Sequence, residues 1–206
     1  MKKAAFLDRD GVLNRKAPEG QYVTRWEEMK FLPGADAAIR LLNEAGFLVV
    51  VVSNQRCVAK GLITSGDLEA MHARMHREFA AAGARIDAIY YCPHDYEPPC
   101  SCRKPKPGML FDAAQALDID LGASWMIGDS TQDVEAGMAA GCSTAQLIED
   151  GISGNRGARV TAPSLLEAVH KILQFESAVV PMQSDPAAPE TGSSTSSSTS
   201  GRPKKS

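Results

Sequence analysis

Two aspartates near the N-terminus have the spacing that nucleophilic and acid–base chemistry would need at one site. Asp8 and Asp10 follow the apolar run that begins at Ala4, and residues two apart in extended backbone project to the same side. One carboxylate could attack a phosphorus atom while the other holds the proton of the leaving oxygen. A carboxylate that approaches an anionic phosphate is repelled unless a divalent cation neutralises both. Oxygen ligands from Asp8 and Asp129 would suit Mg²⁺ in that role.

Three further polar segments supply groups that the same chemistry would require. Ser53 and Lys104 could donate to the remaining oxygens of a phosphoryl group. Asp133 stands four residues after Asp129 at an expected helix start. It should therefore lie on the same face as Asp129, where it could orient the metal or Lys104. Each segment alone is common in proteins, but the four in this order indicate phosphoryl transfer.

A second group of residues has the spacing of a zinc site. Four soft or borderline ligands fall in the short segment from residue 92 to residue 102, namely Cys92, His94, Cys100 and Cys102. Four protein ligands would close a tetrahedral Zn²⁺ site and leave no position for water, so the expected role is structural. The Pro-rich turn between the two ligand pairs is too short to form its own core, and the metal would hold it in place.

Strands and helices are expected to alternate along the chain. Apolar runs predict strands at 4–8, 47–54, 86–92, 124–129 and 143–148, and helical spacing predicts helices at 34–45, 65–82, 108–117, 131–140 and 163–175. This alternation predicts an α/β, Rossmann-like fold with a mostly parallel sheet and helices on both faces. Ligands bind beyond the carboxyl ends of such strands, which is where the polar segments fall. The intervals 14–31 and 56–65 are only long enough for loops, so we expect no cap domain.

Length and composition are typical of one globular domain with a tail. The chain has 206 residues, 44% of them hydrophobic, and a net charge of −3, which argues against bulk binding of nucleic acid or an anionic membrane. It contains neither a run of 18 apolar residues nor the apolar segment of a signal peptide. We therefore expect a cytoplasmic protein with reduced cysteines. We also expect a monomer. Residues 1–180 should form the domain, and the Ser/Thr-rich residues 183–206 should be disordered.

The catalytic segments resemble the pattern of the haloacid dehalogenase superfamily in its phosphatase branch. There the order is DxDG, then Ser or Thr, then Lys, then GDxxxD. The resemblance implies that Asp8 is the nucleophile, which forms an aspartyl-phosphate, and that Asp10 is the general acid and then the base. It also implies a Mg²⁺ ion held by Asp8, the backbone carbonyl of Asp10, and Asp129.

The zinc loop narrows this resemblance. A loop that ends in CxCRKPxPGM, with SNQRxxAxGL earlier in the chain, is similar to the D-glycero-D-manno-heptose 1,7-bisphosphate 7-phosphatase family. The family pattern implies substrate contacts from Asp8, Arg9, Asp10, Glu19, Gly20, Gln21, Tyr22, Ser53, Asn54, Gln55, Arg56, Arg103 and Lys104. The chain departs from the pattern at Cys57, where the family usually has Gly, and at Lys60 and Ser130.

Two other functions remain open at this point. One is hydrolysis of histidinol phosphate, because histidinol-phosphatase domains carry a related zinc loop. The other is a catalytically inactive, zinc-stabilised binding module, against which the intact catalytic set argues. A sugar bisphosphate is favoured because several cations could meet a second phosphate, namely Arg15, Lys16, Arg56, Lys60 and Arg103.

His72 and His76 are expected on a solvated helix face, and Cys142 is expected to be buried.

Overall fold

Six parallel strands form the sheet of the computed structural model, which describes residues 1–148 and 157–179. In spatial order they are β3 (Ala88–Cys92), β2 (Leu48–Asn54), β1 (Ala4–Leu7), β4 (Trp125–Gly128), β5 (Ser143–Leu147) and β6 (Val160–Ala162). Every neighbouring pair is parallel. The predicted parallel sheet is therefore confirmed.

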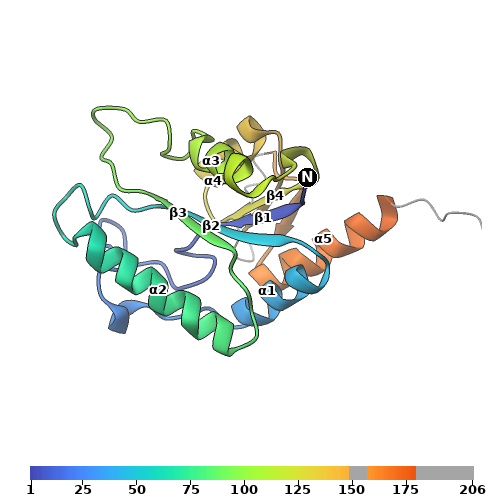
Figure 1. Cartoon of the computed structure of the whole chain (residues 1–206), viewed down its shortest axis with the longest axis horizontal. Coiled ribbons are helices and arrows are strands. Elements are labelled where there is room, and N and C mark those ends of the chain that lie inside the picture. Colours follow the sequence, from blue (N-terminus) through green and yellow to red (C-terminus); the bar gives the residue numbers. More distant parts are fainter. Residues whose placement is uncertain (149–156, 180–206) are drawn as a thin grey trace, which may run out of the picture.

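Helices cover both faces of the sheet (Figure 1). The α-helices are α1 (Ala35–Glu44), α2 (Ser65–Ala81), α3 (Gly108–Leu117), α4 (Thr131–Ala140) and α5 (Leu165–Val179), and two 3₁₀ turns occur at Trp26–Glu28 and Leu121–Ala123. The helices α3 and α4 lie on one side of the sheet, and α1, α2 and α5 lie on the other. All five predicted helices are present, although α5 begins two residues later and runs four residues further than expected.

The β-branched run in β2 divides between the two cores. Val49 and Val51 belong to the cluster under α1 and α5, whereas Val50 and Val52 belong to the cluster under α3. Each of these four side chains is fully buried. Alternate residues of a strand point to opposite faces, so a strand covered on both sides needs a continuous apolar run, as the sequence predicted.

Strand β6 was missed, and the sequence offers little signal for it. It has three residues and pairs only with β5, at the edge of the sheet. Its side chains alternate between buried and partly exposed positions, a pattern too short to distinguish from a loop.

The predicted tail at 183–206 and the end of the domain at residue 180 lie outside the described residues. No helix in the described ranges is both long and apolar enough to cross a membrane.

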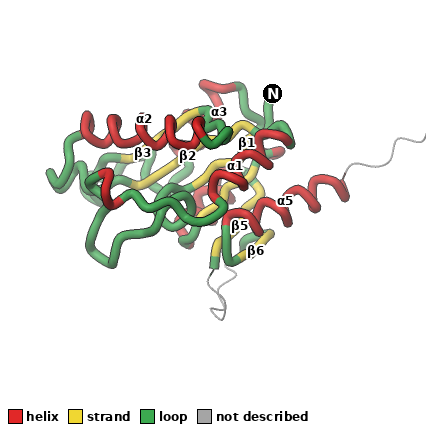
Figure 2. The backbone as a smooth tube through the Cα atoms, turned by 90° about the horizontal axis from the view of Figure 1, so that it is seen from below, coloured by secondary structure: helices red, strands yellow, loops and turns green. Residues whose placement is uncertain are grey.

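Long loops gather at the carboxyl ends of the strands, on the left of Figure 2. The loop after β1 packs on α2 through a small cluster formed by Val23, Met29, Leu68 and Met71. This interval forms a loop with one 3₁₀ turn rather than a cap domain, as expected. It remains close to the sheet edge, where the polar segments meet.

Packing of α4 against the sheet leaves no room for a side chain at Gly137. A Cβ atom there would lie 2.6 Å from the Cβ of Met126 and 2.7 Å from the Cγ2 of Thr144. We predict that Gly137→Ala lowers the free energy of unfolding by about 1–3 kcal/mol, because overpacking forces the helix away from the strands. Urea denaturation followed by circular dichroism would measure the change.

The matched control for this prediction is Gly66→Ala, at the start of α2. The nearest atom to a Cβ at that position is the Oγ1 of Thr64, at 3.9 Å. Alanine should be neutral or slightly stabilising there, because it is the better helix former. Equal destabilisation by the two substitutions would contradict the packing argument.

Candidate active site

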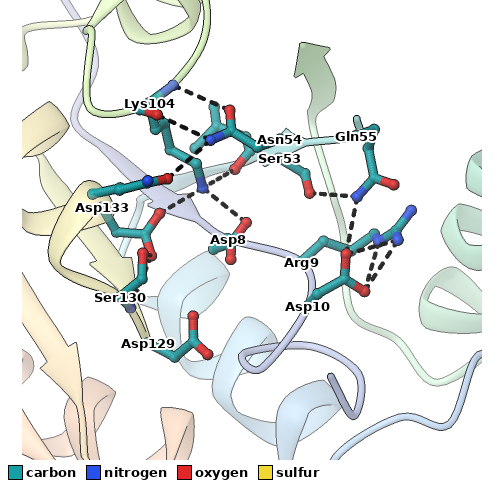
Figure 3. Close-up of polar contacts among 12 residues, drawn as sticks. Asp8, Arg9, Asp10, Ser53, Asn54, Gln55, Lys104, Asp129, Ser130 and Asp133 are labelled. Atoms are coloured by element: carbon teal, nitrogen blue, oxygen red, sulfur yellow. Dashed lines mark hydrogen bonds and ion pairs between the residues drawn. The ribbon is translucent and has the colours of Figure 1, made fainter. Parts of the chain in front are cut away.

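A buried lysine joins three segments at the centre of the site (Figure 3). The Nζ of Lys104 donates to the Oδ1 of Asp8 at 2.8 Å and to the carbonyl of Val52 at 2.8 Å, and it forms an ion pair with Asp133. An ammonium has three N–H donors, so all of them have acceptors. The four residues come from the ends of β1 and β2, from the loop before α3, and from α4. One cation thus connects three of the predicted polar segments.

Electrostatics keep this lysine charged. Burial alone would lower the pKa of Lys104, but the carboxylates of Asp133 and Asp8 outweigh burial and raise it. Burial raises the pKa of Asp8 to about 7, an effect that Lys104 opposes. A buried carboxylate with one adjacent cation is therefore sensitive to any further positive charge, which would stabilise its ionised form.

Two side chains hold the ends of this ion network in place. The amide of Asn54 bonds the Lys104 backbone twice, with its Oδ1 accepting from the N–H at 3.1 Å and its Nδ2 donating to the carbonyl at 3.1 Å. The Oδ2 of Asp133 accepts from the N–H and the hydroxyl of Ser130, in a capping box that starts α4. Asn54 was expected to contact substrate; the structure places it on the pocket wall, where its amide clamps Lys104.

Asp10 lies in a separate set of donors. Its carboxylate accepts from Arg9 through Nη2, from the Nδ2 of Asn14 at 2.8 Å, and from the Nε2 of Gln55 at 2.9 Å. Burial would raise the pKa of Asp10, but the Arg9 charge and these hydrogen bonds outweigh it and hold the pKa below its usual value. Sequence reasoning missed Asn14, whose only signal is a polar residue four positions after Asp10.

Cys57, one of the departures from the family pattern, fits into this arrangement. Its thiol lies 3.5 Å from the Oε1 of Gln55, and the Nε2 of that amide donates to Asp10 and to the Oγ of Ser53. Within the described ranges, Asp118 is the one non-glycine residue with positive φ. Cys57 is therefore not in the left-handed conformation that would have strained the turn.

His72 corrects the expectation that it lies on a solvated face. It is 4% exposed, and its Nε2 lies 3.0 Å from the Nη1 of Arg9. Residue 72 follows Leu68 by four positions and precedes Met75 by three, so the helical period itself places it on the buried stripe of α2. The polar residue type obscured this. His76 is exposed, as predicted, and Cys142 is buried.

The carboxylates beside Lys104 fit a divalent cation. Oxygens of Asp8, Asp129 and Asp133 all lie within 4.8 Å of one another. The Oδ1 of Asp129 is buried and has no hydrogen-bond partner among the described residues, which suits a metal ligand. Its Oδ2 forms an ion pair with Lys16 at 2.8 Å. A Cβ at Gly11 would lie 2.3 Å from that same oxygen, so glycine is what lets the loop after β1 approach Asp129.

A pocket of about 530 Å³ opens over these groups. Its walls include Asp8, Asp10, Ser53, Asn54, Gln55, Lys104, Asp129 and Asp133, and the loop after β1 adds Lys16, Glu19, Gly20, Gln21 and Tyr22. Arg9 is fully buried behind Asp10. Most of the predicted site residues therefore converge at this pocket, and Arg9 lies behind Asp10.

Two predicted substrate contacts lie beside the pocket rather than on its wall. Arg56 forms an ion pair with Asp95 at 2.6 Å and stacks on the ring of Tyr96. Arg103 lies against the same ring, 4.6 Å from its centre, and donates to the carbonyl of His94. Both guanidinium groups are thus held by the zinc-type loop.

The four zinc-type residues have the separations of a tetrahedral site. The sulfur of Cys92 is 3.6 Å from that of Cys100, which is 3.5 Å from that of Cys102. The Nδ1 of His94 is 3.5 Å from the Cys92 sulfur and 3.2 Å from the Cys102 sulfur. Tetrahedral ligands about 2.3 Å from a Zn²⁺ ion are roughly 3.8 Å apart, so the cluster fits zinc with little movement.

We predict about one tightly held zinc per chain. Purification without chelator followed by elemental analysis should find it, and Cys100→Ser should lower both the zinc content and the melting temperature, because the loop loses its cross-link. Cys142 is buried outside the cluster. Cys142→Ser is therefore the control and should leave the zinc content unchanged. Zinc-free protein with the same melting temperature would contradict the structural role.

Comparisons with known proteins agree with this geometry. The HAD-hydrolase-like family model matches residues 101–168. A D-glycero-β-D-manno-heptose-1,7-bisphosphate 7-phosphatase of Rhodopseudomonas palustris is 45% identical over 145 residues, which cover 67% of this chain and 79% of the relative. The enzyme of the same name from Pasteurella multocida is 37% identical over 82% of this chain and 94% of its own length.

A solved structure matches most of this chain. The D,D-heptose 1,7-bisphosphate phosphatase of Bordetella bronchiseptica, crystallised with magnesium and phosphate, is 37% identical and has a TM-score of 0.75. The match covers 84% of this chain and 99% of that protein. The chain is thus a HAD-like phosphoric monoester hydrolase, and it belongs to the D-glycero-β-D-manno-heptose-1,7-bisphosphate 7-phosphatase family.

Proposed function

We propose that this chain hydrolyses the 7-phosphate of D-glycero-D-manno-heptose 1,7-bisphosphate through an aspartyl-phosphate on Asp8. The observation that carries the proposal is the buried contact of Lys104 with Asp8 and Asp133, with Asp10 on the wall of the same pocket. The names of the relatives support the substrate.

We also propose a monomer located in the cytoplasm, and size-exclusion chromatography with light scattering would test its oligomeric state.

Asp8, Asp129 and the backbone carbonyl of Asp10 would hold the magnesium. When bound, the ion neutralises charge on the phosphate and on the attacking carboxylate. The chain itself supplies the other groups. The Oδ1 of Asp8 is taken by Lys104, which leaves Oδ2 as the nucleophile. The Oγ of Ser53 would donate to a phosphoryl oxygen, and Lys104 would do so once a phosphoryl oxygen takes the place of one of its three present acceptors.

The reaction then proceeds in two displacements. In the first, the Oδ2 of Asp8 bonds to phosphorus, the bond from phosphorus to the sugar oxygen breaks, and that oxygen takes a proton from Asp10. In the second, Asp10 takes a proton from water, the water oxygen bonds to phosphorus, and the bond to Asp8 breaks. Inorganic phosphate leaves and Asp8 is restored.

The donors around Asp10 suit its second task directly, because a low pKa keeps it ionised before it acts as a base. Its first task requires a proton. The negative charge of an arriving phosphate would disfavour the ionised carboxylate and raise the pKa of Asp10. Substrate binding would therefore help to load the proton that the leaving oxygen needs.

The pocket favours a bisphosphate over histidinol phosphate. Lys16 lines the pocket through the loop after β1, and Arg56 and Arg103 flank Tyr96 beside it. An ammonium or imidazole would instead need a carboxylate that the catalytic set does not use, and Glu19 is the candidate on the pocket wall. The intact ion network also argues against an inactive binding module.

Removal of the nucleophile should abolish turnover. We predict that Asp8→Asn folds but releases essentially no phosphate from heptose 1,7-bisphosphate, because an amide oxygen does not attack phosphorus effectively. Asp112→Asn, on the exposed face of α3, is the matched control and should retain full activity. Activity of Asp8→Asn within about tenfold of the wild type would rule out the proposed nucleophile.

Substrate preference should follow the second phosphate. We predict that kcat/KM for heptose 1,7-bisphosphate exceeds that for histidinol phosphate at least about tenfold, or roughly 1.4 kcal/mol in transition-state stabilisation. At saturating Mg²⁺, Lys16→Met should raise KM for the bisphosphate more than for a heptose 7-monophosphate. Arg15→Met, the adjacent exposed cation, should have a smaller effect. Equal values of kcat/KM for heptose 1,7-bisphosphate and histidinol phosphate would favour the histidinol-phosphate assignment.

A further inference from the structure

Arg9 is a fully buried arginine whose guanidinium has two different partners. Its Nη2 donates to both carboxylate oxygens of Asp10, at 2.8 and 3.0 Å, and its Nε lies 3.3 Å from one of them. Its Nη1 points the other way and lies 3.0 Å from the Nε2 of His72. Arg9 therefore connects the general acid at the pocket to a histidine in the middle of α2.

The direction of the contact with His72 follows from chemistry. An arginine only donates, so the Nε2 of His72 must be the acceptor, and any proton on the neutral ring is on Nδ1. Burial and the Arg9 charge lower the pKa of His72 to about 3, which keeps the ring neutral. The ring also packs edge-on against Tyr91, whose hydroxyl donates to Glu69 on α2. The His72 ring thus contacts both Arg9 and Tyr91.

We propose that His72 is a positioning residue for proton transfer: it holds the Nη1 side of Arg9, so that the opposite edge of the guanidinium fixes the carboxylate of Asp10. This inference rests on the proposed role of Asp10 as general acid and base. A buried N–H group without an acceptor is costly. Without His72, Arg9 would turn or admit water to satisfy Nη1, and Asp10 would lose the alignment of its best donor.

A pair of amide substitutions isolates the acceptor. The Oε1 of a glutamine can reach the position of the histidine Nε2, whereas the oxygen of an asparagine reaches only the position of Nδ1. His72→Gln should therefore keep the acceptor for Arg9, and His72→Asn should remove it while retaining a polar side chain. Both variants would first be checked for folding by circular dichroism and thermal melting. His72→Leu repeats the test with an apolar side chain if His72→Asn does not fold.

The choice of leaving group makes the readout specific to proton transfer. A sugar alkoxide needs a proton as it leaves, whereas p-nitrophenolate leaves without one. General acid catalysis is typically worth ~10²–10⁴-fold. Misalignment of the acid should cost part of that factor. We expect His72→Asn to lower the single-turnover rate of leaving-group release at least ~tenfold on heptose 1,7-bisphosphate and less than ~threefold on p-nitrophenyl phosphate. This rate excludes the second displacement, in which Asp10 acts as a base whichever substrate was used. His72→Gln should stay within ~threefold of the wild type on both substrates.

His76→Leu is the matched control on the same helix. The Nε2 of His76 lies 3.0 Å from the carbonyl of Ile86, away from Arg9. Its loss should affect stability, and any change in the rate of leaving-group release should be equal on the two substrates. Equal losses on both substrates for His72→Asn, or a His72→Gln as defective as His72→Asn, would overturn the positioning role.

Asp10→Asn measured in parallel separates this inference from the proposed function. If Asp10→Asn is selectively defective on the sugar phosphate while His72→Asn is not, the role of Asp10 stands and the role of His72 is wrong. If Asp10→Asn slows leaving-group release by the same factor on both substrates, Asp10 is not the general acid, and the inference about His72 fails with it.

Discussion

One buried cation holds the site together. Lys104 is 3% exposed and forms buried ion pairs with the carboxylates of Asp8 and Asp133. Removing one member of such a network leaves an uncompensated charge in the interior, which is strongly destabilising. The folded protein is therefore stable only when the end of β1, the start of α4 and the loop before α3 lie next to one another. The same contact places Asp8, the proposed nucleophile, among the residues that line the pocket.

Other residues hold the members of this network, and the neighbouring Asp10, in position. Asn54 clamps the Lys104 backbone, and the zinc-type residue Cys102 lies two positions before Lys104. A closed zinc site would thus fix the loop that delivers the lysine. On the other side, Arg9 holds Asp10 from behind and leaves its carboxylate on the pocket wall. Asp8 and Asp10, the proposed nucleophile and general acid, are thus held by different hydrogen-bond donors.

The sequence predicted most of the sheet and the position of the site, because both depend on local patterns. The apolar run in β2 requires burial on two faces, and strand ends in a parallel sheet share one edge. Contacts between distant residues were harder to foresee. His72 lies on a helix 63 positions from its partner Arg9, and its polar type suggested solvent. The short edge strand β6 has no distinctive pattern, and the pairing of Arg56 with Asp95 depends on how the zinc loop folds back.

Trapping the covalent intermediate tests the central claim most directly. A turnover with heptose 1,7-bisphosphate would be quenched within milliseconds and treated with borohydride, which reduces an aspartyl-phosphate to homoserine. Peptide mass spectrometry should then find homoserine at position 8, in an amount that rises and falls with the time of quenching. Phosphate release with unmodified Asp8 at every time, or homoserine at another aspartate, would contradict the assignment of Asp8 as the nucleophile.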